Sequence, residues 1–156
     1  MNTFLRNLKE SDINFLYEIE NDQNLWKFSD QKNGFSRQTL KKYIKIASRQ
    51  NLFQANQIRF VIENIDSKVV GFIDLFDYNS EKKNAYIGIV ILKKFRNKGF
   101  AFEAIKLLEQ ISKNNFGIIE LKAIIKAINI KSIKLFEKSG YKKTVNDTYQ
   151  KKIIDD

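Results

Sequence analysis

The spacing of apolar and polar side chains along the chain predicts alternating strands and helices. The expected elements, in chain order, are a strand at Phe4–Leu8, helices after Ser11-Asp12 and after Ser36, strands at 58–62, Val69–Phe76 and Ala85–Leu92, a helix from about residue 100, a strand at Ile118–Ile128, a short helix that starts at Asn129 and ends at Gly140, and a closing hairpin of Tyr141–Val145 and Thr148–Ile154. This order predicts a mixed α/β fold, with a central sheet and helices on both of its faces.

Ala85–Leu92 is the most strand-like segment. Its near-continuous run of β-branched and other apolar side chains is typical of a central strand that is covered on both faces. Gly88 interrupts the run, and a glycine inside a strand favours a bulge or a close approach of another backbone. A basic turn at 93–99 follows, and then a helix with a regular apolar stripe. The predicted order at this point is therefore strand, basic turn, helix.

The composition removes several classes of chemistry. The 156 residues include no Cys and no His, which excludes disulfides, zinc sites with sulfur or imidazole ligands, cysteine nucleophiles and histidine-based triads. We expect no metal, although oxygen ligands alone leave a Mg²⁺ or Ca²⁺ site open. Acid–base chemistry in this chain must use Asp, Glu, Tyr, Lys or an ordered water.

Length and hydropathy predict the broad class of protein. The chain length and the apolar content of 43% are those of one globular domain, over residues 1–156. No apolar run approaches the roughly 18 residues of a membrane span, and the start of the chain has no secretory signal. We therefore expect a cytoplasmic protein that makes no membrane contact.

The positive charge is concentrated in one part of the chain. Residues 82–143 hold 15 Lys and Arg against 4 Asp and Glu, a net charge of +11, whereas residues 1–81 hold 11 of each kind and are neutral. A basic segment of this kind indicates an anionic partner, such as a nucleic acid, an acidic membrane or a polyphosphate cofactor, unless it is merely a solvated basic surface.

Two sequence motifs lie in this basic segment. The first, Arg96-Asn97-Lys98-Gly99-Phe100-Ala101, joins the predicted central strand to the next helix. Unpaired N–H groups and the helix dipole favour a phosphate at such a helix start, and glycine lets the backbone come close to the anion. The second motif runs from Asn129 to Tyr141 and combines an N-capping Asn, an amphipathic helix and a terminal glycine. Each motif alone also occurs in ordinary basic turns and capped helices.

In this order and spacing, the two motifs together resemble those of the GNAT superfamily of N-acetyltransferases, (Gln/Arg)-x-x-Gly-x-(Gly/Ala) and Asn-x-x-(Ala/Ser)-x-x-(Leu/Ile)-(Tyr/Phe)-x-x-x-Gly-(Phe/Tyr). Segments 5–8, 59–63 and 70–75 are similar to the branch that contains the ribosomal-protein-alanine and spermidine N-acetyltransferases. The resemblance implies the GNAT fold, a mixed and mostly antiparallel sheet with a splayed central strand. It also implies direct transfer of an acetyl group from acetyl-CoA to a primary amine.

The resemblance implies a role for each matched residue. The backbone of Ile89, Val90 and Ile91 would pair with the pantetheine arm after the bulge at Gly88, and a backbone N–H of the same strand would hold the oxyanion. The remaining cofactor contacts are Arg96, Asn97, Lys98, Gly99, Phe100, Ala101 and Phe102 for the pyrophosphate, and Asn129, Ser132, Lys134 and Lys138 for the pantetheine or the nucleotide.

The sequence departs from the family pattern at the groups expected to move protons. Phe136 occupies a position at which the family often has a tyrosine acid, and Tyr86 occupies one that often carries a glutamate base. We expect Tyr141 to replace the acid and Asp74 to act as the base. The alternative for Tyr141 is a core aromatic residue, and the alternative for Asp74 is a solvent-exposed carboxylate at the end of a strand. A missing acid is tolerable because a thiol with a pKa of about 8.5 is already a fair leaving group.

The acceptor side is expected to be acidic and partly aromatic. Residues 10–30 hold six Asp and Glu against Lys27 alone, a net charge of −5, which suits a cationic amine; the alternative is that these acids are capping and solvent-facing residues. Trp26, Phe28 and Phe35 are expected to form an apolar wall.

The expected acceptor is a monoamine. Glutamates that the polyamine enzymes carry after the first helix correspond here to Gln31, Lys32 and Thr39. A peptide N-terminus, a small amine or an amino sugar is therefore favoured over spermidine.

Two other functions stay open. A basic module that binds anions or nucleic acid would explain the charge, but its aromatics would be interleaved with Lys and Arg, whereas those of this chain fall mostly at core-periodic positions; nucleic acid is therefore not the expected partner. A GNAT-fold protein that binds CoA without catalysis would explain Phe136. A homodimer is left open as well.

Overall fold

The computed structural model describes residues 2–29, 31 and 33–154. Within these residues, seven strands form one sheet, in the order β1-β2-β3-β4-β5-β7-β6. The strands are β1 (Thr3–Asn7), β2 (Ile58–Asn64), β3 (Val69–Asn79), β4 (Asn84–Ile91), β5 (Glu120–Ile124), β6 (Lys142–Lys143) and β7 (Thr148–Lys152). Neighbouring strands are antiparallel except for β4 and β5, which are parallel. The mixed, mostly antiparallel sheet predicted from the sequence is confirmed.

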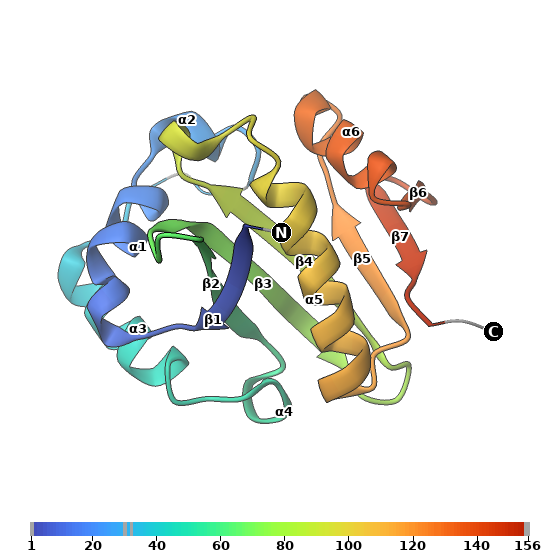
Figure 1. Ribbon diagram of the computed structural model, residues 1–156, viewed down its shortest axis with the longest axis horizontal. Helices are drawn as coiled ribbons and strands as arrows, with labels where there is room; N and C mark the ends of the chain where they lie inside the picture. Colours follow the sequence, from blue (N-terminus) through green and yellow to red (C-terminus); the bar gives the residue numbers. More distant parts are fainter. Residues whose placement is uncertain (1, 30, 32, 155–156) are drawn as a thin grey trace.

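Helices cover both faces of the sheet. They are α1 (Ile13–Glu20), α2 (Gln23–Trp26), α3 (Arg37–Ala47), α4 (Leu52–Ala55), α5 (Phe100–Phe116) and α6 (Ile130–Lys138), with short 3₁₀ turns η1 (Glu10–Asp12) and η2 (Lys93–Phe95). Figure 1 shows α5 in front of the sheet and α1 and α3 together at its left. Alternate side chains of β2 and β3 enter two cores: Val61 and Phe72 pack with α1 and α3, whereas Phe60 and Ile73 pack with α5.

Several element boundaries differ from the predicted ones. The short helices α2 and α4 were not predicted, because four residues carry too little periodicity to be recognised. The strand predicted at Ile118–Ile128 is shorter, since Ile125 N–H already bonds to the carbonyl of Asp147 and the chain then turns towards α6. Asp12 does not cap α1 with its side chain; its carboxylate binds Arg6 and the N–H of Lys9.

The bulge predicted at Gly88 is wrong. The register between β3 and β4 runs without a break from Gly71 opposite Ile91 to Phe76 opposite Tyr86, with Asp74 opposite Gly88. A close backbone approach does exist, but across the sheet at Gly71, where a Cβ atom would clash with the carbonyl oxygen of Val90. At Gly88 a Cβ atom would meet its nearest neighbour, Phe76 Cε1, at an ordinary 3.5 Å.

The two central strands part after three residue pairs. β4 and β5 pair only from Asn84–Glu120 to Tyr86–Lys122, although β4 continues to Ile91. Leu92 N–H bonds to the carbonyl of Val70 on β3. In an antiparallel pair every second residue bonds to the neighbouring strand, so Val90 and Gly88 also direct their N–H and C=O groups towards β3. The intervening residues Ile87, Ile89 and Ile91 direct theirs into the gap. The expected splay of the central strand is present, and it begins at Tyr86.

The structure predicts different effects for alanine at the two strand glycines. Gly71→Ala should lower the free energy of unfolding by about 1–3 kcal/mol, because its Cβ atom forces β3 and β4 apart. The control Gly88→Ala should change it by no more than about 0.5 kcal/mol, because the added methyl group has room. Urea unfolding of both variants measures the difference, and equal stabilities would contradict the close approach at Gly71.

Candidate active site

Two adjoining hollows lie where β4 and β5 separate. The first, the basic hollow, has a volume of about 660 Å³ and the second, the inner hollow, about 350 Å³. They share six lining residues, Leu25, Phe28, Ile89, Val90, Asn129 and Ser132. Figure 1 shows α2 and α6, which contribute to both, at the same end of the sheet. The two hollows therefore form one groove with the unpaired part of β4 as its floor.

The basic hollow is built to hold an anion. Four cationic residues line it (Lys27, Arg96, Lys131 and Lys138), and no carboxylate does so among the described residues. Asn97 (φ 62°) and Gly99 (φ 90°) adopt left-handed backbone conformations that turn the chain into α5. The first hydrogen bond of α5 runs from Glu103 N–H to the Gly99 carbonyl, so the preceding N–H groups of the helix have no intrahelical partner. A Cβ atom at Gly99 would meet nothing within 4 Å, which leaves open space above the turn.

Most of the residues predicted to contact a cofactor line this groove. They are Ile89, Val90, Ile91, Arg96, Asn97, Gly99, Phe100, Ala101, Phe102, Asn129, Ser132 and Lys138. Lys98 and Lys134 do not line it. Lys27 and Lys131 also line the groove but were not predicted from the sequence. Lys131 lies two helical turns before Lys138, so both are on one face of α6. That seven-residue spacing is visible in the sequence and could have identified Lys131.

Arg96 joins the turn to two other parts of the groove. Its Nε donates to the carbonyl of Ile91 at 2.9 Å, and its Nη2 lies 3.8 Å from Asp22 Oδ2, at the residue that caps α2. The Ile91 carbonyl is therefore already bonded, and the backbone groups of Val90 face β3. Of the three β4 residues predicted to pair with an extended ligand, Ile89 has both backbone groups directed into the gap and unbonded within the sheet.

The inner hollow has aromatic walls and one carboxylate. Trp26 and Phe28 line it as predicted, but Phe35 does not: its side chain is exposed and its backbone bonds to Asn21. Phe136 closes the hollow with a buried ring. Glu20 is the single carboxylate among its described lining residues.

Asp74, the predicted base, is engaged by an arginine. Arg59 Nε donates to Asp74 Oδ1 at 2.7 Å and Nη2 donates to Oδ2 at 2.9 Å, while Nη1 donates to Glu20 Oε1 at 3.2 Å. Burial alone would lower the pKa of Arg59, but the attraction of Asp74 and Glu20 outweighs it and raises that pKa, so the guanidinium stays charged. Asp74 is not a lining residue of either hollow.

Tyr141, the predicted acid, lines neither hollow of the groove. Its hydroxyl donates to Glu109 Oε2 at 3.0 Å, on α5, and Glu109 also binds Lys151 Nζ. Burial, reinforced by the Glu109 carboxylate, raises the pKa of Tyr141 above its ordinary value. Its ring packs edge-on against Phe136, with the centroids 5.0 Å apart. This arrangement favours the alternative considered for Tyr141, a core aromatic.

Comparison with known proteins agrees with this geometry. Residues 2–142 match the family described as Acetyltransferase (GNAT) domain. The chain belongs to the GNAT acetyltransferase family. It is accordingly an N-acetyltransferase that acts on an amine with acetyl-CoA.

Individual relatives of this GNAT enzyme are distant. It is 24% identical over 140 residues to the spermidine N(1)-acetyltransferase of Vibrio cholerae, a match that covers 88% of this chain and 77% of that one. It is 28% identical over 92 residues to the SPbeta prophage-derived N-acetyltransferase YokL of Bacillus subtilis, covering 58% of this chain and 51% of that one. The structure of the Vibrio cholerae spermidine N-acetyltransferase with CoA and spermine has a TM-score of 0.82 at 20% identity, with 96% and 93% of the two chains covered.

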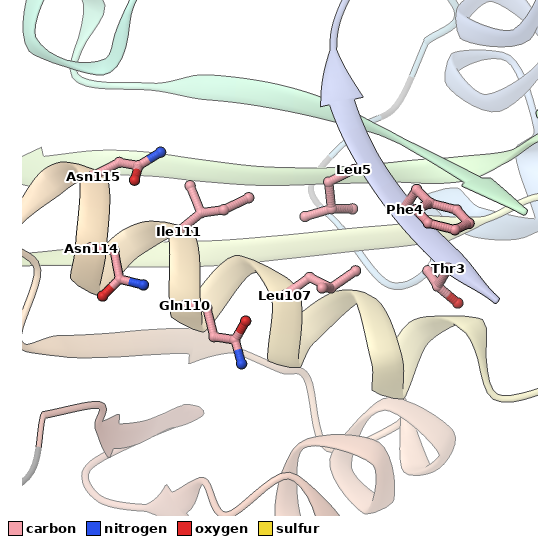
Figure 2. A pocket seen from close by; sticks show the side chains of 8 residues that line it. All are labelled: Thr3, Phe4, Leu5, Leu107, Gln110, Ile111, Asn114 and Asn115. Carbon is pink, nitrogen blue, oxygen red and sulfur yellow. The ribbon is translucent and has the colours of Figure 1, made fainter. Parts of the chain in front are cut away.

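A third hollow in this GNAT enzyme lies elsewhere, between β1 and α5. Figure 2 shows Leu5 on β1 opposite Leu107 and Ile111 on α5. Its polar side chains are amides and the Thr3 hydroxyl, which donates to Glu103. Because none of its described lining residues has a titratable side chain, they offer nothing for proton transfer. The bond to Thr3 also keeps the Glu103 carboxylate engaged with β1.

Metal clusters and membrane-spanning helices are both absent from the residues in the ranges 2–29, 31 and 33–154. These ranges contain no cluster of three or more Asp and Glu side chains arranged to hold a metal ion. None of the helices in them has the length and apolar character to span a membrane.

Replacing Tyr141 by Phe separates the structural role from the catalytic one. We expect an unchanged kcat, because the hydroxyl does not reach the groove, and a loss of about 1–3 kcal/mol of stability at neutral pH, because a hydrogen bond to a carboxylate disappears. A kcat that falls tenfold or more would restore Tyr141 as the acid.

The raised pKa of Tyr141 also predicts a pH effect with a definite sign. Above about pH 10 the unfolded chain releases the Tyr141 proton while the folded chain keeps it, so the free energy of unfolding falls as the pH rises. The slope from this group is at most about 1.4 kcal/mol per pH unit. Urea unfolding of the parent and Tyr141→Phe at increasing pH should show a steeper loss in the parent, and parallel curves would contradict it.

Proposed function

We propose that the groove between β4, α2 and α6 is the active site of acetyl transfer from acetyl-CoA to a primary monoamine. One observation carries this proposal: among the described residues, the free edge of β4 connects a hollow lined by four cationic residues to a hollow lined by a single carboxylate. The first has the charge for a polyphosphate and the second has the charge for an amine, and the strand between them brings the two reactants together.

The turn before α5 would hold the pyrophosphate. Its left-handed backbone at Asn97 and Gly99 directs the free N–H groups of Phe100, Ala101 and Phe102 outwards at the positive end of the helix dipole. On the opposite wall, the ammonium group of Lys138 on α6 lies 4.6 Å from the ring centroid of Phe102, and that of Lys106, on α5 itself, lies 4.3 Å from the same centroid. These contacts support a nucleotide end between α5 and α6.

Ile89 and Asn129 would hold the pantetheine arm. The N–H and C=O groups of Ile89 point into the gap, where the C=O can accept from an amide of an extended ligand and the N–H is left for the thioester carbonyl. Asn129 uses its Oδ1 to accept from Ser132 N–H at 3.3 Å, which caps α6 and leaves the side-chain N–H₂ for a ligand carbonyl.

The chain's contribution to the chemical step is mainly positioning. Acetyl-CoA supplies an activated thioester. The Ile89 N–H would stabilise the negative charge that develops on the thioester carbonyl oxygen, as a fixed donor on the free edge of β4. Phe136 lines the reacting end without a proton to give, so the thiolate leaves unassisted, which its pKa of about 8.5 permits.

The acceptor proposal differs from the substrate of the spermidine N-acetyltransferases. Two of the positions that are glutamates in the polyamine enzymes are used for local structure here: the Gln31 amide donates to the carbonyls of Glu20 and Asn33, and Thr39 bonds to Ser36 at the start of α3. Lys32 lies outside the described residues. A Vibrio cholerae spermidine N-acetyltransferase structure is described as dodecameric; for this chain a homodimer and a cytoplasmic location are our expectations.

Calorimetry with acetyl-CoA tests the cofactor half of the proposal. Replacing both Lys131 and Lys138 by Ala should weaken binding by about tenfold, since each exposed charge contributes up to about 1 kcal/mol. The double variant Lys134→Ala, Lys142→Ala removes the same charge outside the groove and should bind within about twofold of the parent. Equal losses in the two double variants would show that only the net charge of the protein matters.

Thermal unfolding and thiol release complete the test. Acetyl-CoA at 100 times its Kd should stabilise the parent by about 2.7 kcal/mol.

An amine panel of a peptide N-terminus, glucosamine, phenethylamine and spermidine, monitored by release of CoA thiol, should give turnover with a monoamine. Binding of acetyl-CoA without turnover on any amine would favour the non-catalytic alternative, and spermidine as the best substrate by kcat/KM would overturn the monoamine class.

A further inference from the structure

The structure sorts the acidic residues that precede residue 31. Four of the six are engaged elsewhere, exposed or both: Asp12 binds Arg6, Asp22 approaches Arg96, Glu10 lies 3.9 Å from Arg49, and Glu18 is exposed on α1. Asp30 lies outside the described residues. Among the five described acids of this set, Glu20 is the one that lines the groove.

The Glu20 side chain is fixed from one side and open on the other. Arg59 Nη1 binds its Oε1 at 3.2 Å, and among the described residues Oε2 has no hydrogen-bond partner. The carboxylate is about four-fifths buried, with a side-chain exposure of 21%. A carboxylate that is mostly buried but keeps one accessible oxygen without a donor favours a ligand that brings one.

The backbone around Glu20 is anchored by the walls of the inner hollow. Trp26 Nε1 donates to the Glu20 carbonyl oxygen at 3.3 Å and Gln31 Nε2 donates to the same atom at 2.7 Å. These bonds fix the last residue of α1 against α2. They involve the main chain, so they do not depend on the charge of the side chain.

The charge balance around Glu20 favours one positive charge. Arg59 lies between Glu20 and Asp74, and these three groups carry a net charge of −1. Tyr43, whose ring lies 5.7 Å from the Arg59 guanidinium, adds no charge, since burial raises the pKa of its phenol. The cluster therefore lacks one cation, at a point where the neighbouring walls are aromatic.

We propose that Glu20 binds the ammonium group of the acceptor and takes up its proton, with Arg59 and Asp74 as positioning residues. The acceptor class is a primary amine with one positive charge and an apolar substituent that packs on Trp26 and Phe28. This inference rests on the proposed function and names the group that selects the substrate in the same groove.

The proton balance follows from the pKa values of the reactants. A primary amine has a pKa of about 10.4 in water and arrives as R–NH₃⁺, without the lone pair needed for attack. Transfer of one proton to Glu20 frees the lone pair, which forms the N–C bond as the C–S bond breaks. The nitrogen then loses a second proton, and the thiolate takes up one proton, so these two changes cancel. Glu20 releases to solvent the proton that it took from the ammonium group.

Among the described residues, this hollow offers a second ammonium group no further carboxylate. Among the described lining residues Glu20 stands alone, and the basic hollow beyond it is lined by Lys and Arg. A polyamine would therefore place its remaining charges near like charges or leave them without a partner, which disfavours binding.

A matched pair of ligands tests Glu20 separately from turnover. Calorimetry on protein saturated with CoA, which permits no reaction, compares phenethylamine with its neutral analogue 2-phenylethanol. The parent and the control Glu18→Gln should bind the amine at least tenfold more tightly than the alcohol. Glu20→Gln keeps the hydrogen bond from Arg59 but loses the charge, so it should bind the two ligands equally and retain the CoA affinity of the parent.

Each outcome decides the inference. Loss of the amine preference in Glu20→Gln alone, with partial retention in Glu20→Asp, supports it. The inference is overturned if Glu20→Gln still prefers the amine, or if the parent shows no amine preference. Either result overturns the inference even if the parent acetylates amines, in which case the proposed function still stands. Failure of the parent to bind acetyl-CoA would contradict the proposed function instead. If Glu20→Gln does not fold, Glu20→Asp takes its place in the titration, and an amine preference equal to that of the parent then also overturns the inference.

Discussion

The separation of β4 from β5 after three paired residues is the constraint on which the active site depends. A parallel pair that continued to Ile91 would use the N–H and C=O groups of Ile89 within the sheet and leave no room for a ligand. Because the strands part, the start of α5, the start of α6 and the free edge of β4 converge on one groove. The antiparallel pairing of β4 with β3 keeps that edge straight and in register.

Charge is arranged along the groove according to the two reactants. The cationic residues lie in the basic hollow, and the inner hollow has Glu20, whose carboxylate is oriented by Arg59. Arg96 connects the two regions, because it bonds to the end of β4 and approaches Asp22 at the start of α2. The net charge of the whole protein, +10, therefore differs in sign from the local charge on the acceptor side. There a substrate would meet the cluster of Arg59, Glu20 and Asp74, with a net charge of −1.

Local patterns in the sequence were sufficient for the order of the strands and the four longer helices, the turn before α5 and the cap of α6, because each depends on residues close together in the chain. The sequence could not indicate which partner a residue meets across the fold. Gly88 has the local pattern of a close approach that in fact occurs at Gly71. Tyr141 meets Glu109, which is 32 positions away, and Asp74 meets Arg59, 15 positions away on the next strand. Glu20 was one acid among six until the structure showed that, of the five described acids, it alone lines the inner hollow.

The parting of β4 and β5 also bears on self-association. A strand edge with free N–H and C=O groups is normally a template on which another chain can add a strand and begin to aggregate. Here the edge forms the floor of a groove between α2 and α6, and Lys27, Arg96, Lys131 and Lys138 line the basic hollow of that groove. A second copy of this cationic chain would be repelled there, whereas an anion would be attracted. The same lysines and arginine thus protect the fold from its own exposed backbone.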